Sequence, residues 1–222
     1  MPPRKTRKTI KTKPLIYIFY EGESEQCYAK FLKEQFGDVA SFIIPSSKGL
    51  FSEAESKFHK DIRYRNSIEV TNEVWFFFDV EEVDRDKWDN HLRIIKKLRR
   101  LGGQHKIRVR LLMTSGCIEY WFMLHYQMIS PPIITVADKE RIRHQLERLV
   151  PSYKKGNQNA ISGIAKSFPI AVENGQQVLQ GLLSSGLPTL DDSDERNKWL
   201  YQSSLTFTTV HEAIQFLQAK SN

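Results

Sequence analysis

Acidic residues follow two apolar runs in the first half of the chain. Glu21 comes directly after the run 15–20, and Asp79 and Glu81 follow the aromatic run 74–78. If both runs are buried parallel strands, these carboxylates meet at the carboxyl edge of one sheet, where open α/β sheets bind ligands. Carboxylate oxygens are hard ligands that suit Mg²⁺ or Mn²⁺. The pattern therefore predicts a metal-dependent enzyme that acts on phosphodiesters.

Of the two acids after the aromatic run, Asp79 is the better candidate metal ligand. Asp79 and Glu81 are two residues apart, so on an extended chain their side chains point to the same side. Asp79 ends the aromatic run directly, whereas Glu81 is close enough to the next loop to belong to it. The acids that follow, Asp84 and Asp86 among them, fit a second interpretation, a solvated helix start favoured by the helix dipole.

Glu21 belongs to the segment Glu-Gly-Glu-Ser-Glu at 21–25. Gly22 permits a tight turn from strand to helix and leaves Glu21 at the sheet edge. There Glu21 can act as a general acid or base or as a metal ligand, since both roles need a carboxylate near the scissile phosphate. The alternative is that Glu23 and Glu25 only complement the positive end of the helix, and we favour it for Glu23.

A third group of candidates surrounds the turn after the run 108–113. Ser115 and Gly116 offer backbone N–H groups before a helix, an arrangement that can hold a phosphate. Glu119 and His125 are candidate catalytic residues on that helix, but they lie roughly 120° apart around its axis. A hydrogen-bonded core histidine is the alternative for His125. Cys117 has no evident catalytic partner.

Strand and helix patterns alternate through the first 130 residues. Predicted strands span 15–20, 41–45, 74–78 and 108–113, and the helices between them start at a Ser24 cap, near Glu53 and at Trp88. An apolar helix spans 118–128, and Pro131 and Pro132 end it. This order predicts an α/β fold with a mostly parallel sheet flanked by helices.

The sequence after residue 130 predicts helices without strands. We expect helices over 138–150, 158–168 and 171–183, a polar loop over 184–197, and a last helix that starts with a Thr209–Glu212 capping box. The chain thus divides into a basic arm at 1–13, an α/β catalytic core at 14–130, and a helical C-terminal subdomain at 131–222 that packs on the core.

Charge and composition favour anionic partners inside the cell. The chain of 222 residues has a net charge of +7, and six of its first thirteen residues are Lys or Arg. We expect this arm to be disordered and attracted to nucleic acid, although such a run also occurs as a solubilising tail. No apolar run approaches the ~18 residues of a membrane span, and no signal peptide is evident. Two cysteines fit a reducing cytoplasm.

Taken in order, the motifs resemble those of a known family, the RloB-like proteins of bacterial abortive infection, whose core is a Toprim-type domain. The similar segments cover nearly the whole chain: Tyr-Glu-Gly-Glu-Ser-Glu at 20–25, Phe-Asp-Val-Glu at 78–81, Thr-Ser-Gly-Cys-Ile-Glu-Tyr-Trp at 114–121 with His125, Tyr-Lys-Lys at 153–155 and Thr-Phe-Thr-Thr-Val-His-Glu at 206–212.

The resemblance implies that Glu21 works with metal-binding acids at Asp79 and Glu81, as in Toprim nucleases and topoisomerases. The chain departs from the familiar Asp-x-Asp motif at Glu81, whose carboxylate lies one methylene further out. It also has Thr-Ser-Gly where an Asn-Pro pair is more familiar, which leaves the role of Ser115 and Gly116 open. By analogy with defence nucleases of this fold, RNA, and tRNA in particular, is the preferred substrate over DNA.

We therefore expect an Mg²⁺- or Mn²⁺-dependent nuclease in anti-phage defence, either monomeric or a homodimer. The residues expected to contact nucleic acid are Lys5, Arg7, Lys8, Lys48, Ser115, Lys154 and Lys155. The alternative function is a non-catalytic nucleic-acid-binding or sensor module that works with an ATPase or effector partner. Phosphoryl transfer to small molecules is not expected, because the chain has no Gly-rich phosphate loop with Lys-Ser/Thr.

Overall fold

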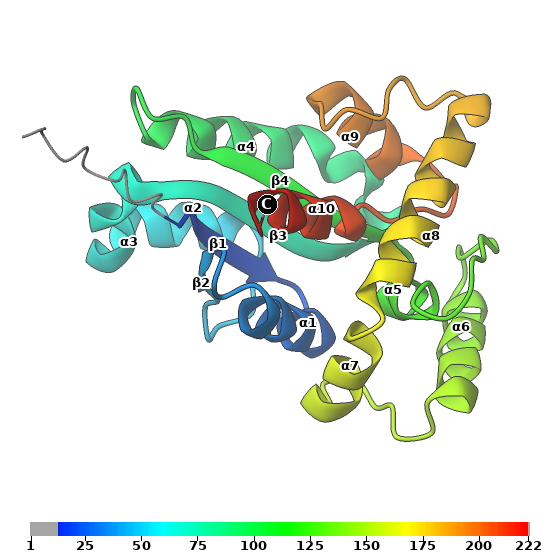
Figure 1. Cartoon of the computed structure of the whole chain (residues 1–222). Helices are drawn as coiled ribbons and strands as arrows, with labels where there is room; N and C mark the ends of the chain where they lie inside the picture. Colours follow the sequence, from blue (N-terminus) through cyan, green and yellow to red (C-terminus); the bar gives the residue numbers. More distant parts are fainter. Residues whose placement is uncertain (1–12, 222) are drawn as a thin grey trace, which may run out of the picture.

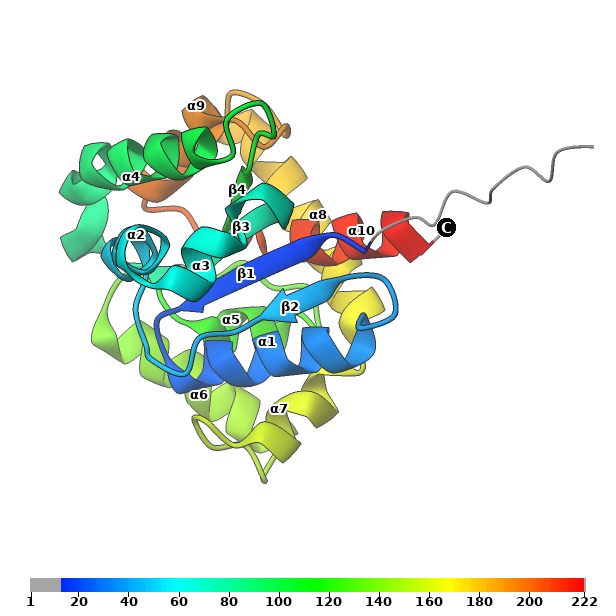
Figure 2. The same ribbon diagram turned by 90° about the vertical axis from the view of Figure 1, so that its left-hand side faces the viewer.

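Within the part of the chain that the structure describes, four parallel strands form one sheet in the order β2-β1-β3-β4. The computed structural model describes residues 13–221, and Figures 1 and 2 show helices on both faces of the sheet. The strands are β1 (Leu15–Tyr20), β2 (Ser41–Ile43), β3 (Thr71–Val80) and β4 (Arg108–Ser115). The predicted α/β architecture with a parallel sheet is confirmed.

The helices cover the sheet and form most of the C-terminal part. They are α1 (Glu23–Gln35), α2 (Phe51–Lys60), α3 (Ile62–Asn66), α4 (Trp88–Leu101), α5 (Ile118–Met123), α6 (Val136–Leu149), α7 (Gln158–Ala165), α8 (Phe168–Gly181), α9 (Asp194–Gln202) and α10 (Val210–Ser221). Across residues 13–221, every helix is too short or too polar to cross a lipid bilayer.

Alternation along the strands divides the apolar side chains between two hydrophobic cores, because successive residues of a strand point to opposite faces. Trp75 and Phe77 of β3 face a core that includes α1, α5 and α10. Phe76 and Phe78 face a second core that includes α2, α4 and α9. C-terminal helices contribute to both cores, so this part of the chain is packed on the sheet from two sides.

Several helix boundaries differ from the sequence prediction. The helix expected over 53–65 is two helices, because Asp61 is extended and accepts a hydrogen bond from the Arg63 N–H, which starts α3. The helix expected over 118–128 ends at Met123. Gly22, not Ser24, precedes the first turn of α1. The polar stretch expected as a loop over 184–197 contains the start of α9, with Ser193 as its cap.

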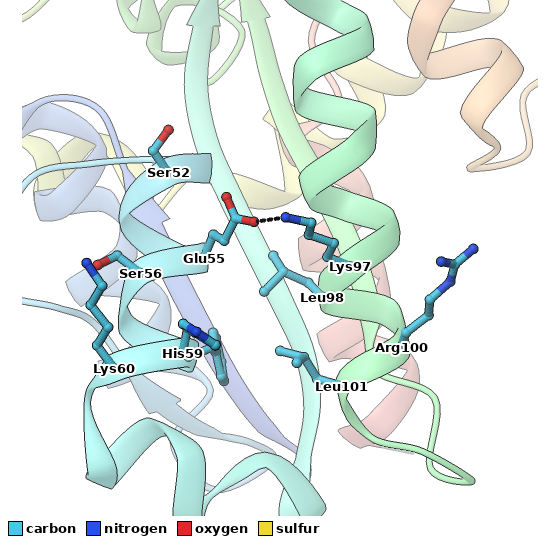
Figure 3. Close-up of a pocket in the computed structure, with 10 residues that line it drawn as sticks. Ser52, Glu55, Ser56, His59, Lys60, Lys97, Leu98, Arg100 and Leu101 are labelled. Atoms are coloured by element: carbon cyan, nitrogen blue, oxygen red, sulfur yellow. Dashed lines mark hydrogen bonds and ion pairs between the residues drawn. The ribbon is translucent and has the colours of Figure 1, made fainter.

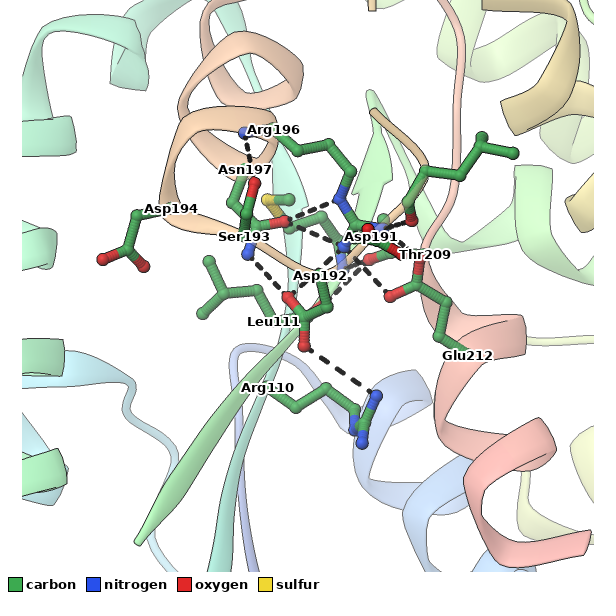
Figure 4. A network of polar contacts seen from close by, with 12 residues as sticks. Arg110, Leu111, Asp191, Asp192, Ser193, Asp194, Arg196, Asn197, Thr209 and Glu212 are labelled. Atoms are coloured by element: carbon green, nitrogen blue, oxygen red, sulfur yellow. Dashed lines mark hydrogen bonds and ion pairs between the residues drawn. The ribbon is translucent and has the colours of Figure 1, made fainter. Parts of the chain in front are cut away.

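The Thr209–Glu212 capping box is replaced by tertiary contacts (Figure 4). The Thr209 hydroxyl donates to the Leu111 carbonyl of β4 at 2.7 Å. The Glu212 carboxylate instead pairs with Arg196, a side chain with no exposed surface. Arg196 also contacts Asp192 at 3.3 Å, so a buried ionic network joins α9, α10 and the loop before α9.

Candidate active site

The ends of β1 and β3 lie side by side at the carboxyl edge of the sheet. Tyr20 pairs with Phe77 in the parallel register, and the Glu21 N–H donates to the Phe77 carbonyl at 3.1 Å. The Glu21 carboxylate in turn accepts the backbone N–H of Asp79 at 3.1 Å. The two acids expected at this edge are therefore brought into direct contact.

Asp79 carries the feature most typical of a binding site. Its Oδ1 atom is buried and has no hydrogen-bond partner among residues 13–221. Burial raises the pKa of the Asp79 carboxyl well above its usual range. Negative charge from three neighbouring carboxylates adds to this shift: Glu25, Glu21 and Glu119. A buried carboxylate oxygen without a partner, among other acids, is costly unless a cation or a proton offsets the repulsion.

Glu25 belongs to this acidic group, although it was not among the residues predicted for the site. The residue is only 4% exposed. Burial, with the charges of Glu21 and Glu119, raises the pKa of Glu25 to about 7. Gly22 makes room for it, since a Cβ at Gly22 would lie 2.6 Å from Glu25 Oε2. The four-residue spacing from Glu21 across a strand–turn–helix was the available signal, because the first helical turn brings residue 25 back to the sheet edge.

Glu119 reaches the group from α5 and is fixed by the C-terminal part. The Tyr153 hydroxyl donates to Glu119 Oε1 at 2.9 Å, and Lys155 Nζ lies 3.6 Å from the same oxygen. The loop that carries these residues is held against α1, because the Gly156 N–H donates to Ser24 Oγ at 3.2 Å. The C-terminal part thus completes the acidic group.

Glu21, Glu25 and Asp79 line an open hollow of about 380 Å³, and Glu119 lies behind them outside its lining. Lys48 and Lys155 stand at its rim, each more than half exposed, and Lys48 pairs with Glu23 at 3.1 Å. The residues around the hollow are Glu21, Gly22, Glu23, Ser24, Glu25, Lys48, Asp79, Ile118 and Lys155. Acids on the floor and lysines at the rim suit a cation below and a phosphate above.

Glu81 does not line this hollow. Its carboxylate pairs with Lys139 of α6 at 2.6 Å and faces a neighbouring depression beside Val80 and Gly116. Glu81 is still extended, with φ −110° and ψ 159°, and the chain turns only from Glu82. The ion pair with Lys139, not a backbone turn, therefore keeps the Glu81 carboxylate out of the hollow that Asp79 lines. Glu81 still adds negative charge near Glu21.

Ser115 and Gly116 are not free to bind a phosphate, contrary to the expectation. The Ser115 hydroxyl accepts the Phe207 N–H at 2.9 Å, and the Ser115 N–H donates to the Phe207 carbonyl. The Gly116 N–H donates to the Val80 carbonyl at 3.0 Å. Gly116 has φ +77° and lies against Ile133, where a Cβ would come within 2.3 Å of the side chain. This turn therefore anchors the C-terminal segment.

The remaining expected residues lie elsewhere. His125 is 1% exposed in the core, with Nδ1 bonded to the Trp121 carbonyl and Nε2 to the Tyr28 hydroxyl, and burial lowers its pKa to about 4. This is the hydrogen-bonded core histidine of the alternative interpretation, so we do not carry His125 into the site. Lys154 is exposed outside the hollow. Lys5, Arg7 and Lys8 lie outside the described residues.

The donor set fits a divalent cation in its chemistry. Four carboxylates act on one another at this edge, and one of their oxygens is buried without a partner. Within residues 13–221, no three Asp, Glu, His or Cys side chains are yet arranged as a metal shell. Glu21, Glu25 and Asp79 would therefore have to draw together around Mg²⁺ or Mn²⁺, with Glu119 beside them.

A comparison with known protein families matches residues 16–217 to the family described as RloB-like protein. The chain belongs to the RloB-like family. The match runs from β1 into α10, so it includes every residue of the acidic group and the loop that holds Glu119. Membership in this family is consistent with an association with defence. No curated protein and no solved structure matches this RloB-like chain significantly.

Proposed function

We propose that this RloB-like protein is a metal-dependent nuclease that cleaves phosphodiester bonds, with RNA preferred over DNA. The observation that supports this most is the unpartnered, buried Asp79 Oδ1 among Glu21, Glu25 and Glu119. The carboxylates of such a group repel one another, and a bound divalent cation would offset that repulsion. Toprim-type chemistry, implied by the sequence resemblance, uses acids at this edge of the sheet.

The acids at the sheet edge have separate parts in the proposed reaction. Asp79, Glu21 and Glu25 would hold Mg²⁺ or Mn²⁺, which supplies stabilisation of negative charge on the phosphate. Glu21 is oriented by the Asp79 N–H through one oxygen, which leaves its second oxygen to complete the metal shell or to hold a proton. Glu119 is held in place by Tyr153.

The lysines at the rim would position the nucleic acid. Lys155 is 65% exposed at its side chain and Lys48 is 57% exposed, so both are able to leave their present carboxylate partners for a phosphate. The Lys48–Glu23 pair is exposed on both sides, where such pairs contribute about 1 kcal/mol or less. Lys155 lies 3.6 Å from the buried Glu119 carboxylate, which also accepts a hydrogen bond from Tyr153. Exposed lysines of this kind add attraction that does not depend on sequence.

The decisive experiment measures cleavage of tRNA, single-stranded RNA, plasmid DNA and single-stranded DNA by the purified protein with Mn²⁺, Mg²⁺ or EDTA. We expect metal-dependent cleavage that falls by roughly 100-fold or more in Asp79→Asn and Glu21→Gln. Asp86→Asn is the matched control, because Asp86 is an exposed acid in the segment after β3 that does not line the hollow.

Equal cleavage by Asp79→Asn, Glu21→Gln and the parent protein would disprove the proposal. Circular dichroism and the thermal unfolding midpoint of each variant establish that a lost activity does not reflect a lost fold. Persistence of cleavage in EDTA would disprove the metal dependence specifically.

The second candidate function is a nucleic-acid-binding or sensor module without catalysis, working with a partner protein. The observation that favours it is the Glu81–Lys139 ion pair, which keeps an expected metal ligand out of the hollow. This function predicts nucleic-acid binding that is the same in EDTA and in Mn²⁺ and is unchanged by Asp79→Asn. Metal-dependent cleavage by the purified protein would exclude it.

A further inference from the structure

The helical layer formed by α2, α3 and α4 carries a concentrated positive charge. Residues 51–66 and 88–106 contain ten Lys and Arg but four Asp and Glu. This layer covers the face of the sheet opposite to α1 (Figures 1 and 2). The layer thus has ten basic against four acidic residues, whereas the rest of the chain after the N-terminal arm is acidic on balance.

Three of the four acids of this layer pair with its own Lys and Arg, which leaves several cations available. Glu55 of α2 is contacted by Lys97 and Arg93 of α4. Within residues 13–221, five cations of the layer have no carboxylate within 4.0 Å: Lys60, Arg65, Lys96, Arg100 and Lys106. Unpaired, exposed cations on one face attract polyanions and release counterions when they bind them.

A pocket of about 630 Å³ lies on the same face, between α2 and α4. Its floor is apolar, with Phe58 and Leu98 buried and Leu101 partly exposed. Figure 3 shows Lys60 on the outer side of α2 and Arg100 on the outer side of α4, so the two cations flank the pocket from opposite sides. This volume is in the range of ligand pockets, and it admits a nucleobase or a ribose.

The pocket is remote from the acidic hollow. Lys97–Leu101 form the end of α4 that precedes β4, at the amino edge of the sheet, whereas Asp79 and Glu21 lie at the carboxyl edge. None of the residues around the acidic hollow lines this pocket. The two features would therefore contact different parts of one extended ligand.

We propose that the face between α2 and α4 binds a single-stranded segment of nucleic acid. Lys60 and Arg100 would contact its phosphates, and the floor of Phe58, Leu98 and Leu101 would take one base or ribose. This ligand combines the anionic groups and the apolar rings that the pocket's flanks and floor fit. The inference rests on the proposed function, since it gives that nucleic-acid substrate a second contact surface.

The test is the affinity of the full-length protein for fluorescein-labelled oligo(U) RNA, and for DNA of matched sequence, measured by fluorescence anisotropy in EDTA at several salt concentrations. In Lys60→Ala/Arg100→Ala we expect the salt slope to fall by about 1.4 and the affinity at about 0.1 M salt to fall on the order of twentyfold. Ser56→Trp fills the pocket without a charge change, so it should weaken binding at an unchanged slope.

The matched control is Lys33→Ala/Lys198→Ala, which removes two exposed lysines of α1 and α9. If this control weakens RNA binding as much as Lys60→Ala/Arg100→Ala does, the loss of affinity reflects net charge alone and the inference is overturned. Binding undetectable in the parent protein, or polyglutamate competing as well as oligo(U), would overturn it too, the latter in favour of an acidic protein partner. RNA and DNA bound equally well would assign the contact to the shared phosphodiester backbone, as proposed.

Binding and cleavage fail independently in this design. If the binding results hold while no cleavage occurs with metal, the nuclease proposal alone is lost. If metal-dependent cleavage occurs but Lys60→Ala/Arg100→Ala binds like the parent, only the second contact surface is lost.

Discussion

The carboxylate of Glu21 accepts a hydrogen bond from the backbone N–H of Asp79, at 3.1 Å. This contact joins the end of β1 to the end of β3, so the acid of one strand is oriented by the backbone of the next. The Asp79 side chain is then left to face the hollow with a buried oxygen that has no partner in residues 13–221. Glu21 is thus held in a fixed orientation, whereas Asp79 keeps an oxygen that is available to a cation.

Asp79→Asn should stabilise the metal-free protein. Replacing the carboxylate by an amide removes a buried charge that Glu21, Glu25 and Glu119 repel. We expect the free energy of unfolding at pH 8 in EDTA to rise on the order of 1 kcal/mol. Urea unfolding followed by circular dichroism measures this. Asp86→Asn should leave the unfolding free energy unchanged, and a destabilised Asp79→Asn would contradict the repulsion.

Glu25→Gln should change how stability depends on pH. The folded-state pKa of Glu25 is raised from 4.5 to about 7, so the folded protein binds the proton more tightly than the unfolded chain. This contribution is fully present below pH 4.5 and is lost as the pH rises through about 7. The variant should lack that loss, so its stability relative to the parent should increase between about pH 5 and 8 in EDTA.

Two buried histidines act in the opposite sense, so the comparison with Glu25→Gln must be made against the parent protein at each pH. Burial lowers the pKa of His125 to about 4 and that of His211 to about 3. Their contribution is lost as the pH falls below about 6.5, because only the unfolded chain takes up the protons. A variant-minus-parent difference that stays constant across pH would contradict the prediction for Glu25.

Mn²⁺ should stabilise the folded protein through the acidic group. A ligand that binds only the folded state stabilises it by about 2.7 kcal/mol at 100 times its dissociation constant. We expect the thermal unfolding midpoint to rise with Mn²⁺ concentration in the parent protein and to stay constant in Asp79→Asn. An identical rise in both proteins would place the metal at a different site.

Lys139→Met should release Glu81 from its present ion pair. If Glu81 then turns towards the acidic group, the affinity for Mn²⁺ measured by calorimetry should rise severalfold, because the group gains a further carboxylate. Lys139→Met/Glu81→Gln should cancel the gain. Equal affinity in Lys139→Met and the parent would show that Glu81 takes no part in metal binding. The loss of a partly exposed pair should itself cost about 1 kcal/mol or less.

Arg196→Met should strongly destabilise the fold. The Arg196 side chain has no exposed surface and pairs with Glu212 and Asp192 (Figure 4). Its removal leaves the Glu212 carboxylate buried without a cation, whereas Asp192 keeps Arg108 and Arg110. We expect a loss of about 3 kcal/mol or more in the free energy of unfolding. Arg99→Met, which breaks the half-exposed pair with Asp194, should cost about 1 kcal/mol or less. Similar losses would contradict the burial argument.

The sequence by itself determined the sheet and two of its edge acids. Runs of β-branched and aromatic residues need burial on both faces, which specifies a parallel strand such as β1 whatever surrounds it. Because Glu21 and Asp79 follow such runs directly, the ends of two neighbouring parallel strands had to bring them together. This inference required only local pattern and the geometry of parallel strands.

Only the tertiary structure decided the rest of the site. Glu25 joins the acidic group because the turn at Gly22 folds α1 back to the sheet edge, and Glu81 leaves it because Lys139, 58 residues later, binds its carboxylate. The Ser115 hydroxyl likewise accepts a hydrogen bond from the backbone N–H of Phe207, so it is not available to a phosphate. These outcomes depend on contacts between segments far apart in the chain. Tertiary packing decides which polar groups come within hydrogen-bonding distance, and the local sequence does not encode that packing.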